Sequence, residues 1–306
     1  MNSAQPDCSI IICTRGRNVS LLKTLNAFRS VAIPAGWLVE LIVADNDGDA
    51  GAHDLVASLR IPSIHLYYLH VPKPGKSHAL NLAIAVARGR VMLFTDDDVE
   101  PADSWLLRMA EPMLHGKCDA VAGRIELAPH LERPWFGVMH RTWLAEVADP
   151  AQGELVLVGA SMGIHRRVFE VIGHFDEALG PGASGFGEET LFGMRLEAAG
   201  FSISPVVDTF VVHHPAESRL LRSEWLLAAL RLGETSAYIM HHWEHASLVL
   251  PRLRAFFLRA KLRARTLHSH TTDEEVEGCP EWEMSYHVQI ARLDKYAEEA
   301  CKPRNY

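Results

Sequence analysis

The sequence predicts an α/β fold, with a mostly parallel sheet flanked by helices and a C-terminal helical extension. Short apolar runs alternate with helical patterns up to about Pro215, and the connections between them are short. This alternation is typical of parallel strands whose crossover helices cover both faces of a sheet. After Pro215 the strand-like runs stop and helical periodicity continues. We therefore expect a sheet domain over residues 1–215 and a helical region over residues 216–306.

The elements of the expected sheet domain follow one another in a regular order. Ser9–Thr14 is a continuous apolar run, as expected of a strand buried on both faces. Further strands are expected at 38–44, 64–71, 91–95, 120–126, 155–158 and 205–214. Helices are expected at 21–28, 79–87, 105–114 and 188–199, the last with Gly200 as a C-terminal stop signal.

Polar residues stand at the carboxyl ends of several expected strands, where open α/β sheets bind their ligands. Thr14-Arg15, Asp45 and the triplet Asp96–Asp98 occupy such ends. If the strand continues that far, Asp96 and Asp98 point to the same side. Two converging carboxylates suit a hard divalent cation that also binds substrate phosphates. A solvated acidic turn before the next helix is the alternative.

Two further residues have chemistry that suits a nucleotide. Asp45 could accept hydrogen bonds from ribose hydroxyls or a base N–H, with an Asx turn as the alternative. Lys76 stands before a helix start whose free N–H groups suit a phosphate. The full loop G-x-x-x-x-G-K-[ST] is absent, because His70 occupies its first glycine position. An ordinary P-loop nucleotidase is therefore excluded.

The overall composition excludes several other classes of protein. The chain has 306 residues, 48% of them hydrophobic and 22% charged, which is ordinary for a globular protein. A net charge of −8 provides no general basic field, so we expect no nucleic-acid partner. The five cysteines have neither metal-ligand spacing nor the pattern of a disulfide framework. With no secretory-signal pattern and no long apolar span, a cytoplasmic location is expected.

In the order and spacing of its motifs, the chain resembles the family-2 glycosyltransferases, which have the GT-A (Rossmann-like) fold. Phe94–Pro101 is similar to the family's DxD motif and is the strongest match. The other matching segments are Ile11–Arg17, Val43–Asn46 and Gly75–Asn81. The resemblance covers about the first 215 residues.

This resemblance implies a nucleotide-sugar donor, most commonly a UDP-sugar, whose diphosphate is bridged by Mg²⁺ or Mn²⁺. It implies that Asp45 recognises the nucleoside by hydrogen bonds and that Asp98 is the chief metal ligand. Asp96 would then lie close to both the ribose and the metal. Lys76 stands where the family more often has a small residue or Arg. The donor-binding residues implied are Thr14, Arg15, Arg17, Asp45, Lys76, Asn81, Asp96 and Asp97.

The segment Gly180–Gly187 has four glycines in eight residues, which predicts a mobile loop. A lid over bound donor, including Gly185 and Gly187, is the functional interpretation, and a disordered surface loop is the alternative. Glu188 and Glu189 follow, and acids at a helix start also favour the helix dipole. By resemblance to the family's xED motif, Glu189 is the catalytic base, with Glu in place of the usual Asp.

Two more features complete the expected site. Gly159 begins a run of small residues that resembles the family segment where the acceptor approaches the backbone. His213 and His214 end the strand that starts at Pro205, and a histidine beside an acidic metal site is a plausible third ligand. The resemblance favours His214 for this position, with His213 as the second choice.

Within the helical region, 252–265 contains six basic residues and no acid. On a helix, Leu253, Phe256, Phe257, Ala260 and Ala264 form one stripe with basic residues on both sides. This arrangement suits a helix that lies on the inner face of an anionic membrane. Leu258 and Leu262 on the opposite side fit equally with an ordinary packed helix or a homodimer interface.

Together these features predict an inverting glycosyltransferase that acts on a glycan or lipid-linked glycan, in synthesis of bacterial surface polysaccharide or glycoconjugate. Glu189 would take the proton of the acceptor hydroxyl while the metal-bound diphosphate leaves. One alternative is a nucleotidyl- or pyrophosphate-transferring enzyme that uses the same acids. Another is a non-catalytic module that binds nucleotide sugars.

Overall fold

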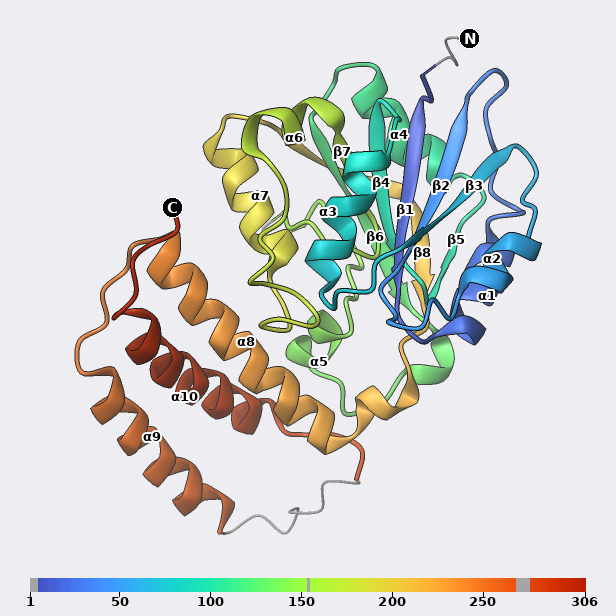
Figure 1. The fold of residues 1–306 in the computed structure, drawn as a ribbon. Coiled ribbons are helices and arrows are strands. Elements are labelled where there is room, and N and C mark those ends of the chain that lie inside the picture. Colours follow the sequence, from blue (N-terminus) through green and yellow to red (C-terminus); the bar gives the residue numbers. More distant parts are fainter. Residues whose placement is uncertain (1–4, 153–154, 268–275) are drawn as a thin grey trace. The chain divides into compact units, whose positions relative to one another are not determined.

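A computed structural model describes residues 5–152, 155–267 and 276–306 (Figure 1). The contacts within it divide the chain into two compact units. The first unit consists of Met1–Glu132, Leu144–Glu177 and Glu188–His214. The second consists of Arg133–Trp143, Ala178–Gly187 and Pro215–Tyr306. Two segments that precede residue 215 therefore pack with the C-terminal helices.

The first unit is built on a sheet that has eight strands within the described residues, in the order β3-β2-β1-β4-β7-β6-β8-β5 (Figure 1). The strands are β1 Cys8–Thr14, β2 Val39–Asp45, β3 Ile64–His70, β4 Val91–Asp96, β5 Val99–Pro101, β6 Ala120–Leu127, β7 Met162–His165 and β8 Ile203–His213. Strands β3, β2, β1 and β4 pair in parallel, as do β6 and β8. Strand β7 is antiparallel to β4 and β6, and β5 is antiparallel to β8. The predicted mostly parallel sheet is confirmed.

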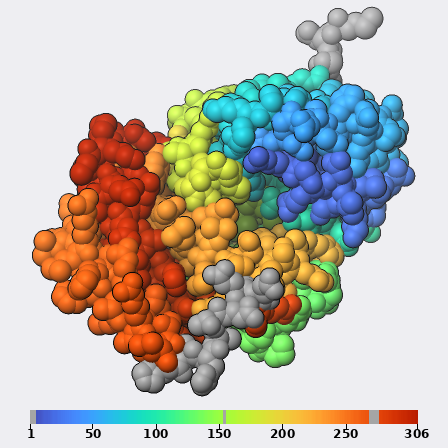
Figure 2. All heavy atoms as spheres, turned by 60° about the horizontal axis from the view of Figure 1, so that its bottom comes forward, coloured from blue at the N-terminus to red at the C-terminus, as the bar shows by residue number. Residues whose placement is uncertain are grey.

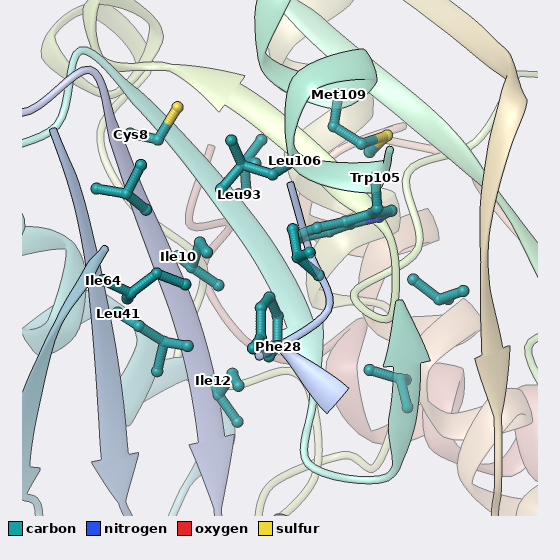
Figure 3. Packing of buried hydrophobic residues seen from close by; sticks show 14 of the residues in the cluster. Cys8, Ile10, Ile12, Phe28, Leu41, Ile64, Leu93, Trp105, Leu106 and Met109 are labelled. Carbon is teal, nitrogen blue, oxygen red and sulfur yellow. The ribbon is translucent and has the colours of Figure 1, made fainter. Parts of the chain in front are cut away.

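Helices cover both faces of this sheet. They are α1 Asn18–Ala27, α2 His53–Ser58, α3 Lys76–Val86, α4 Trp105–Leu114, the 3₁₀ turn η1 Pro129–Leu131, α6 Arg166–Ile172 and α7 Glu188–Ala198. Ile10 and Ile12 of β1 belong to the core that α1, α2 and α4 close, where Phe28 and Trp105 pack (Figure 3). Ile11 belongs to the opposite core, closed by α3, α6 and α7. Successive residues of a strand face opposite sides, so an unbroken apolar run is the pattern such a strand requires.

The strand register brings the expected ligand-binding ends together. Thr14 pairs with Asp45 at the ends of β1 and β2, and Cys13 pairs with Asp96 at the end of β4. At the end of β8, His213 pairs with Val99, the residue that follows the Asp triplet. The carboxyl ends of β1, β2, β4 and β8 therefore meet at one edge of the sheet.

One expected strand does not form. Residues 155–158 are apolar but lie outside the sheet, and the strand in this part of the chain is β7. Leu157 is buried in the core beside α7, while Ser161 N–H donates to the carbonyl of Val158 in a turn. The positions beside β4 and β6 are taken by β7, so this run is buried as extended chain without strand partners.

The second unit is helical, as expected of the C-terminal part of the chain. Its elements are α5 Val138–Trp143, the 3₁₀ turn η2 Glu217–Leu220, α8 Arg222–His242, α9 Pro251–Thr266 and α10 Glu281–Glu299. Helices α8 and α10 pack closely, because a Cβ atom on Gly233 would lie 2.4 Å from the carbonyl oxygen of Val288. A buried ion pair joins Arg222 to Glu283. Among the described helices, none combines the length and apolarity needed to cross a bilayer.

Candidate functional site

Asp96, Asp98 and His213 form an acidic cluster that could hold a metal ion, with one ligand atom of each within 4.8 Å of the others. Asp96 ends β4, and Asp98 lies in the turn between β4 and β5. The strand thus stops before Asp98, and the turn rather than strand alternation brings the two acids together. His213 joins them from the end of β8.

The geometry of His213 suits a metal ligand. Its Nδ1 lies 2.8 Å from the carbonyl oxygen of Leu144, which can only accept a hydrogen bond, so Nδ1 carries the proton. The Nε2 atom then offers its lone pair toward Asp98 Oδ1, 3.3 Å away. A histidine oriented through its second nitrogen, together with two carboxylates, is a donor set that fits Mn²⁺ or Mg²⁺.

His214 lies outside this cluster, so the geometry favours His213, the second choice, as the histidine beside the acids. Its Nε2 is 3.5 Å from Glu100 Oε1, and its ring stacks on His130. Burial lowers the pKa of His214, and attraction from Glu100 opposes that shift only in part. Successive side chains at a strand end point to opposite sides, so only one of the two histidines can face the acids.

Arg17 and Thr14 hold the middle acid of the triplet. The Thr14 hydroxyl donates to Asp97 Oδ2 at 2.6 Å, and Arg17 donates to both carboxylate oxygens of Asp97. Arg17 also donates to Asp98 Oδ2 at 2.8 Å. Burial raises the pKa of Asp97 to about 6 despite the nearby guanidinium.

These contacts bear on the donor site. The side chain of Asp97 is fully buried and pairs with Arg17, so its contact with the donor stays a prediction. Arg17 is 46% exposed and faces the metal-site acid Asp98, while Arg15 lies exposed beside it. Of these residues, Arg17 is the one placed to reach a phosphate.

Asp45 has the surroundings of its alternative interpretation, an Asx turn. It is buried, and its carboxylate accepts hydrogen bonds from the N–H groups of Asp47 and Ala52 and from the hydroxyl of Tyr68. These bonds close the turn after β2, which is the Asx-turn interpretation. A nucleoside contact by Asp45 stays a prediction.

Asn46 is a site residue that the sequence analysis missed. Its side-chain amide donates to the carbonyls of Val71 and Lys73, and its Oδ1 accepts from Gly75 N–H at 2.9 Å. Asn46 therefore shapes the loop that delivers Lys76 to the site. An asparagine directly after a strand end was the available signal, but nothing local shows which loop it would hold.

Lys76 connects two groups of acids. Its Nζ lies 3.0 Å from Asp96 Oδ1, 3.6 Å from Glu189 Oε1 and 3.8 Å from Glu188 Oε1. Burial alone lowers the pKa of Lys76, but attraction from these three carboxyls outweighs it and raises the pKa well above its ordinary value. Lys76 is therefore a permanent cation between the acidic cluster and the start of α7.

Glu188 and Glu189 differ in access. The Glu188 side chain is 2% exposed, and burial together with repulsion from Glu189 raises its pKa well above the ordinary value. Glu189 is 15% exposed, which makes it the more accessible acid of the pair. Gly159 lies against it, because a Cβ atom there would be 2.4 Å from Glu189 Oε1 and 3.1 Å from Lys76 Nζ. Only glycine fits this position without moving the acid.

The structure does not bring the remaining predicted residues into this group. Asn81 bonds both backbone groups of Phe175, through its amide N–H to the carbonyl and through its carbonyl to the N–H. It thus fixes a chain segment, and its expected donor contact stays a prediction. Gly185 and Gly187 belong to the second unit, where φ values of +103° and +87° let their loop approach α8. Their function as a lid stays a prediction.

Comparisons with known proteins agree with this fold. The succinoglycan biosynthesis protein ExoM of Rhizobium meliloti (strain 1021) is 29% identical over 244 residues, which cover 76% of this chain and 75% of ExoM. The mannosyltransferase PcManGT from Pyrobaculum calidifontis, solved with GDP-Man and Mn²⁺, has a TM-score of 0.62 at 16% identity, covering 96% of this chain and 88% of PcManGT.

A second solved structure shares the fold. Residues 1–349 of S. aureus TarS with UDP-GlcNAc give a TM-score of 0.50 at 14% identity, covering 96% of this chain and 90% of that one. A sequence model described as glycosyl transferase family 2 matches residues 9–173, which include the acid triplet, Lys76 and Gly159. The chain therefore belongs to glycosyl transferase family 2.

Proposed function

We propose that this glycosyltransferase is inverting and metal-dependent, and transfers a sugar from a nucleoside-diphosphate donor to an acceptor hydroxyl. The observation that carries the proposal is the position of Lys76, within 4 Å of both Asp96 and Glu189. Through it, the acids suited to a metal-bound diphosphate and the acid suited to proton transfer belong to one site. Both structural relatives hold nucleotide sugars, one of them with Mn²⁺, which supports the same donor class here.

A divalent cation would be held by Asp96, Asp98 and His213. When bound, such an ion neutralises the negative charge that develops on a leaving diphosphate. Arg17 and Lys76 place two further positive charges beside these acids. They suit the phosphate oxygens of the donor, which would otherwise repel the carboxylates.

Glu189 is the proposed base. The more exposed acid of the pair takes the proton of the acceptor hydroxyl as its oxygen attacks the anomeric carbon, on the face opposite the leaving diphosphate. Attack from that face inverts the configuration of the sugar. A positioned carboxylate in this role contributes a factor of about 10²–10⁴ in rate. Burial and repulsion from Glu189 raise the pKa of Glu188, which makes the deeper acid the poorer candidate for the base.

The relative ExoM is named for succinoglycan biosynthesis, which supports a polysaccharide pathway for this chain as well. We propose a glycan or lipid-linked glycan as the acceptor, in the synthesis of a bacterial surface polysaccharide. A cytoplasmic location is part of this proposal. UDP-sugars and GDP-sugars are the donors to test first, since the two structural relatives hold one of each.

Calorimetric titration with UDP, GDP and dTDP, each with and without Mn²⁺, tests the donor site. We expect one nucleotide to bind only with metal and to lose that binding in Asp98→Ala. The control Asp54→Ala removes an exposed carboxylate of α2 and should bind like the native chain. If no nucleotide binds in the presence of Mn²⁺ or Mg²⁺, the proposed donor site is wrong.

Product analysis separates the alternatives. Release of a nucleoside diphosphate, with inverted anomeric configuration of the transferred sugar by NMR, supports the proposed reaction. Release of pyrophosphate would instead identify a nucleotidyl-transferring enzyme. Donor binding without any turnover over a panel of acceptors would favour the non-catalytic module.

A further inference from the structure

The exposed surface of α9 carries a row of apolar side chains. Leu253, Phe256 and Phe257 are 48%, 62% and 55% exposed, and Ala260 and Ala264 continue the row along the helix. We call these five residues the α9 stripe. At 100° per residue they share one face of the helix. Leu267, 84% exposed, follows on the same side directly after the helix.

The opposite face of α9 packs against α10. Ala255 is fully buried, and Leu258 and Leu262 are half-buried, one helical turn apart along that side. These are the residues that, in the sequence alone, fitted an ordinary packed helix. The structure uses them for packing within the second unit, so the α9 stripe is left exposed on that unit. Figure 2 shows the orange atoms of this part of the chain at the surface.

Basic residues separate the two apolar faces. Arg252, Arg259 and Arg263 lie about 100° to one side of the stripe, and Arg254, Lys261 and Arg265 lie about 100° to the other. Two of them are anchored on α10, since Arg259 pairs with Asp294 and the Arg265 guanidinium lies 4.1 Å above the Trp282 ring. No acid occurs between Pro251 and Leu267.

The basic rows beside the α9 stripe indicate which kind of partner can bind there. A second copy docking through the same stripe would bring the cationic rows of the two helices against each other, with no acid on α9 to compensate. A bilayer with anionic lipids suits both features of the helix. Its acyl chains can contact the α9 stripe, and its phosphates can contact the basic rows beside the stripe. Arginine and lysine can extend past apolar surface to reach those phosphates.

We propose that α9 docks this protein on the surface of an anionic lipid bilayer. The α9 stripe enters the boundary between headgroups and acyl chains, and the two basic rows contact lipid phosphates. The helix lies in the plane of the membrane and does not cross it. This proposal goes beyond the transfer reaction, because it names a surface to which the enzyme binds and holds whatever the donor sugar is.

Vesicle flotation with the full chain tests the proposal, comparing phosphatidylcholine alone with a mixture containing phosphatidylglycerol. We expect binding only to the anionic vesicles, weakening as salt is raised. The double variant Phe256→Ser with Phe257→Ser should lower binding about 10-fold or more, because it removes most of the inserted apolar surface. Its control, Val86→Ser with Val171→Ser, changes helix residues that are 53% and 67% exposed elsewhere and should leave binding unchanged.

A charge variant tests the basic rows separately. Replacing Arg254, Lys261 and Arg263 by Gln should lower the affinity for anionic vesicles on the order of 100-fold, at about fivefold for each charge. Replacing exposed Lys23, Arg29 and Lys117 by Gln makes the same change of net charge elsewhere and should have little effect. Circular dichroism and thermal unfolding should match the native chain for every variant, since these side chains are exposed.

Three outcomes would overturn the proposal. The first is equal binding to neutral and anionic vesicles, and the second is equal loss of binding in the control variants. The third is a dimer in sedimentation experiments that dissociates in the Phe256→Ser, Phe257→Ser variant while vesicles are not bound. That last result would assign the α9 stripe to a second copy of the chain.

Discussion

The two charged regions of this protein use charge in opposite ways. In the first unit, Lys76 and Arg17 are placed against carboxylates, and the acids themselves are buried or nearly so. On α9, basic side chains stand exposed in rows without an acid on the same helix. Charges packed among one another are costly to disturb, whereas exposed charges contribute little to folding. The first arrangement suits chemistry on a bound substrate, and the second suits attraction to an extended surface.

The largest expected effect is on the proposed base. Glu189→Gln should lower kcat by about 10²–10⁴-fold and leave donor affinity nearly unchanged, because the amide keeps the shape but cannot take a proton. Glu188→Gln is the matched control. Since Glu188 is 2% exposed and its pKa is raised by burial and by Glu189, its amide should cost far less activity. Equal losses in the two variants would contradict the assignment of the base.

Removing the positive charge of Lys76 should destabilise the fold, because the acids around it would then repel one another. Lys76→Met leaves Asp96, Glu188 and Glu189 facing one another without a positive charge, and should cost up to about 3 kcal/mol of unfolding free energy in urea titrations. Lys261→Met on α9 makes the same chemical change on an exposed surface. We expect it to alter stability by less than about 0.5 kcal/mol. A similar cost for both would remove the distinction between the two regions.

A smaller effect is expected from one added methyl group. Gly159→Ala would place a Cβ atom 2.4 Å from Glu189 Oε1 and so displace the base, lowering kcat about 10–100-fold. Gly193→Ala in α7 is the control, because its Cβ would be 3.9 Å from the nearest side-chain atom, on Leu157. Steady-state kinetics should show normal activity for this variant, and its helix should be slightly more stable.

The last expected effect concerns stability and pH, and lies away from the site. Burial raises the pKa of Asp119, but hydrogen bonds from Ser202 and Arg167 outweigh it and leave the pKa below its ordinary value. The carboxylate therefore stabilises the fold above the unfolded pKa, and this contribution is lost as pH falls through the folded pKa. Asp119→Asn should cost about 1.5–3 kcal/mol at pH 7, and the difference from the native chain should shrink below about pH 4. A difference that does not change with pH would contradict this origin.

Much of the fold could be predicted because the relevant patterns are local. Continuous apolar runs predicted β1, β2 and β4 to within a residue or two, and the helix over Trp105–Leu114 matched at both ends. The acid triplet was expected at a strand end because it directly follows such a run. The run at 155–158 failed for a non-local reason, since its place beside β4 and β6 is taken by β7.

The sequence by itself determined the class of fold, the family and the position of the acids along the chain. Only the tertiary structure decided which side chains meet. It placed His213 rather than His214 beside Asp98, made Asp45 close its own turn, and set Lys76 between the end of β4 and the start of α7. It also decided which side of α9 faces outward. The periodicity of a sequence indicates which residues of a helix or strand share a face. Which other element packs on that face depends on strand register and on packing across the whole chain.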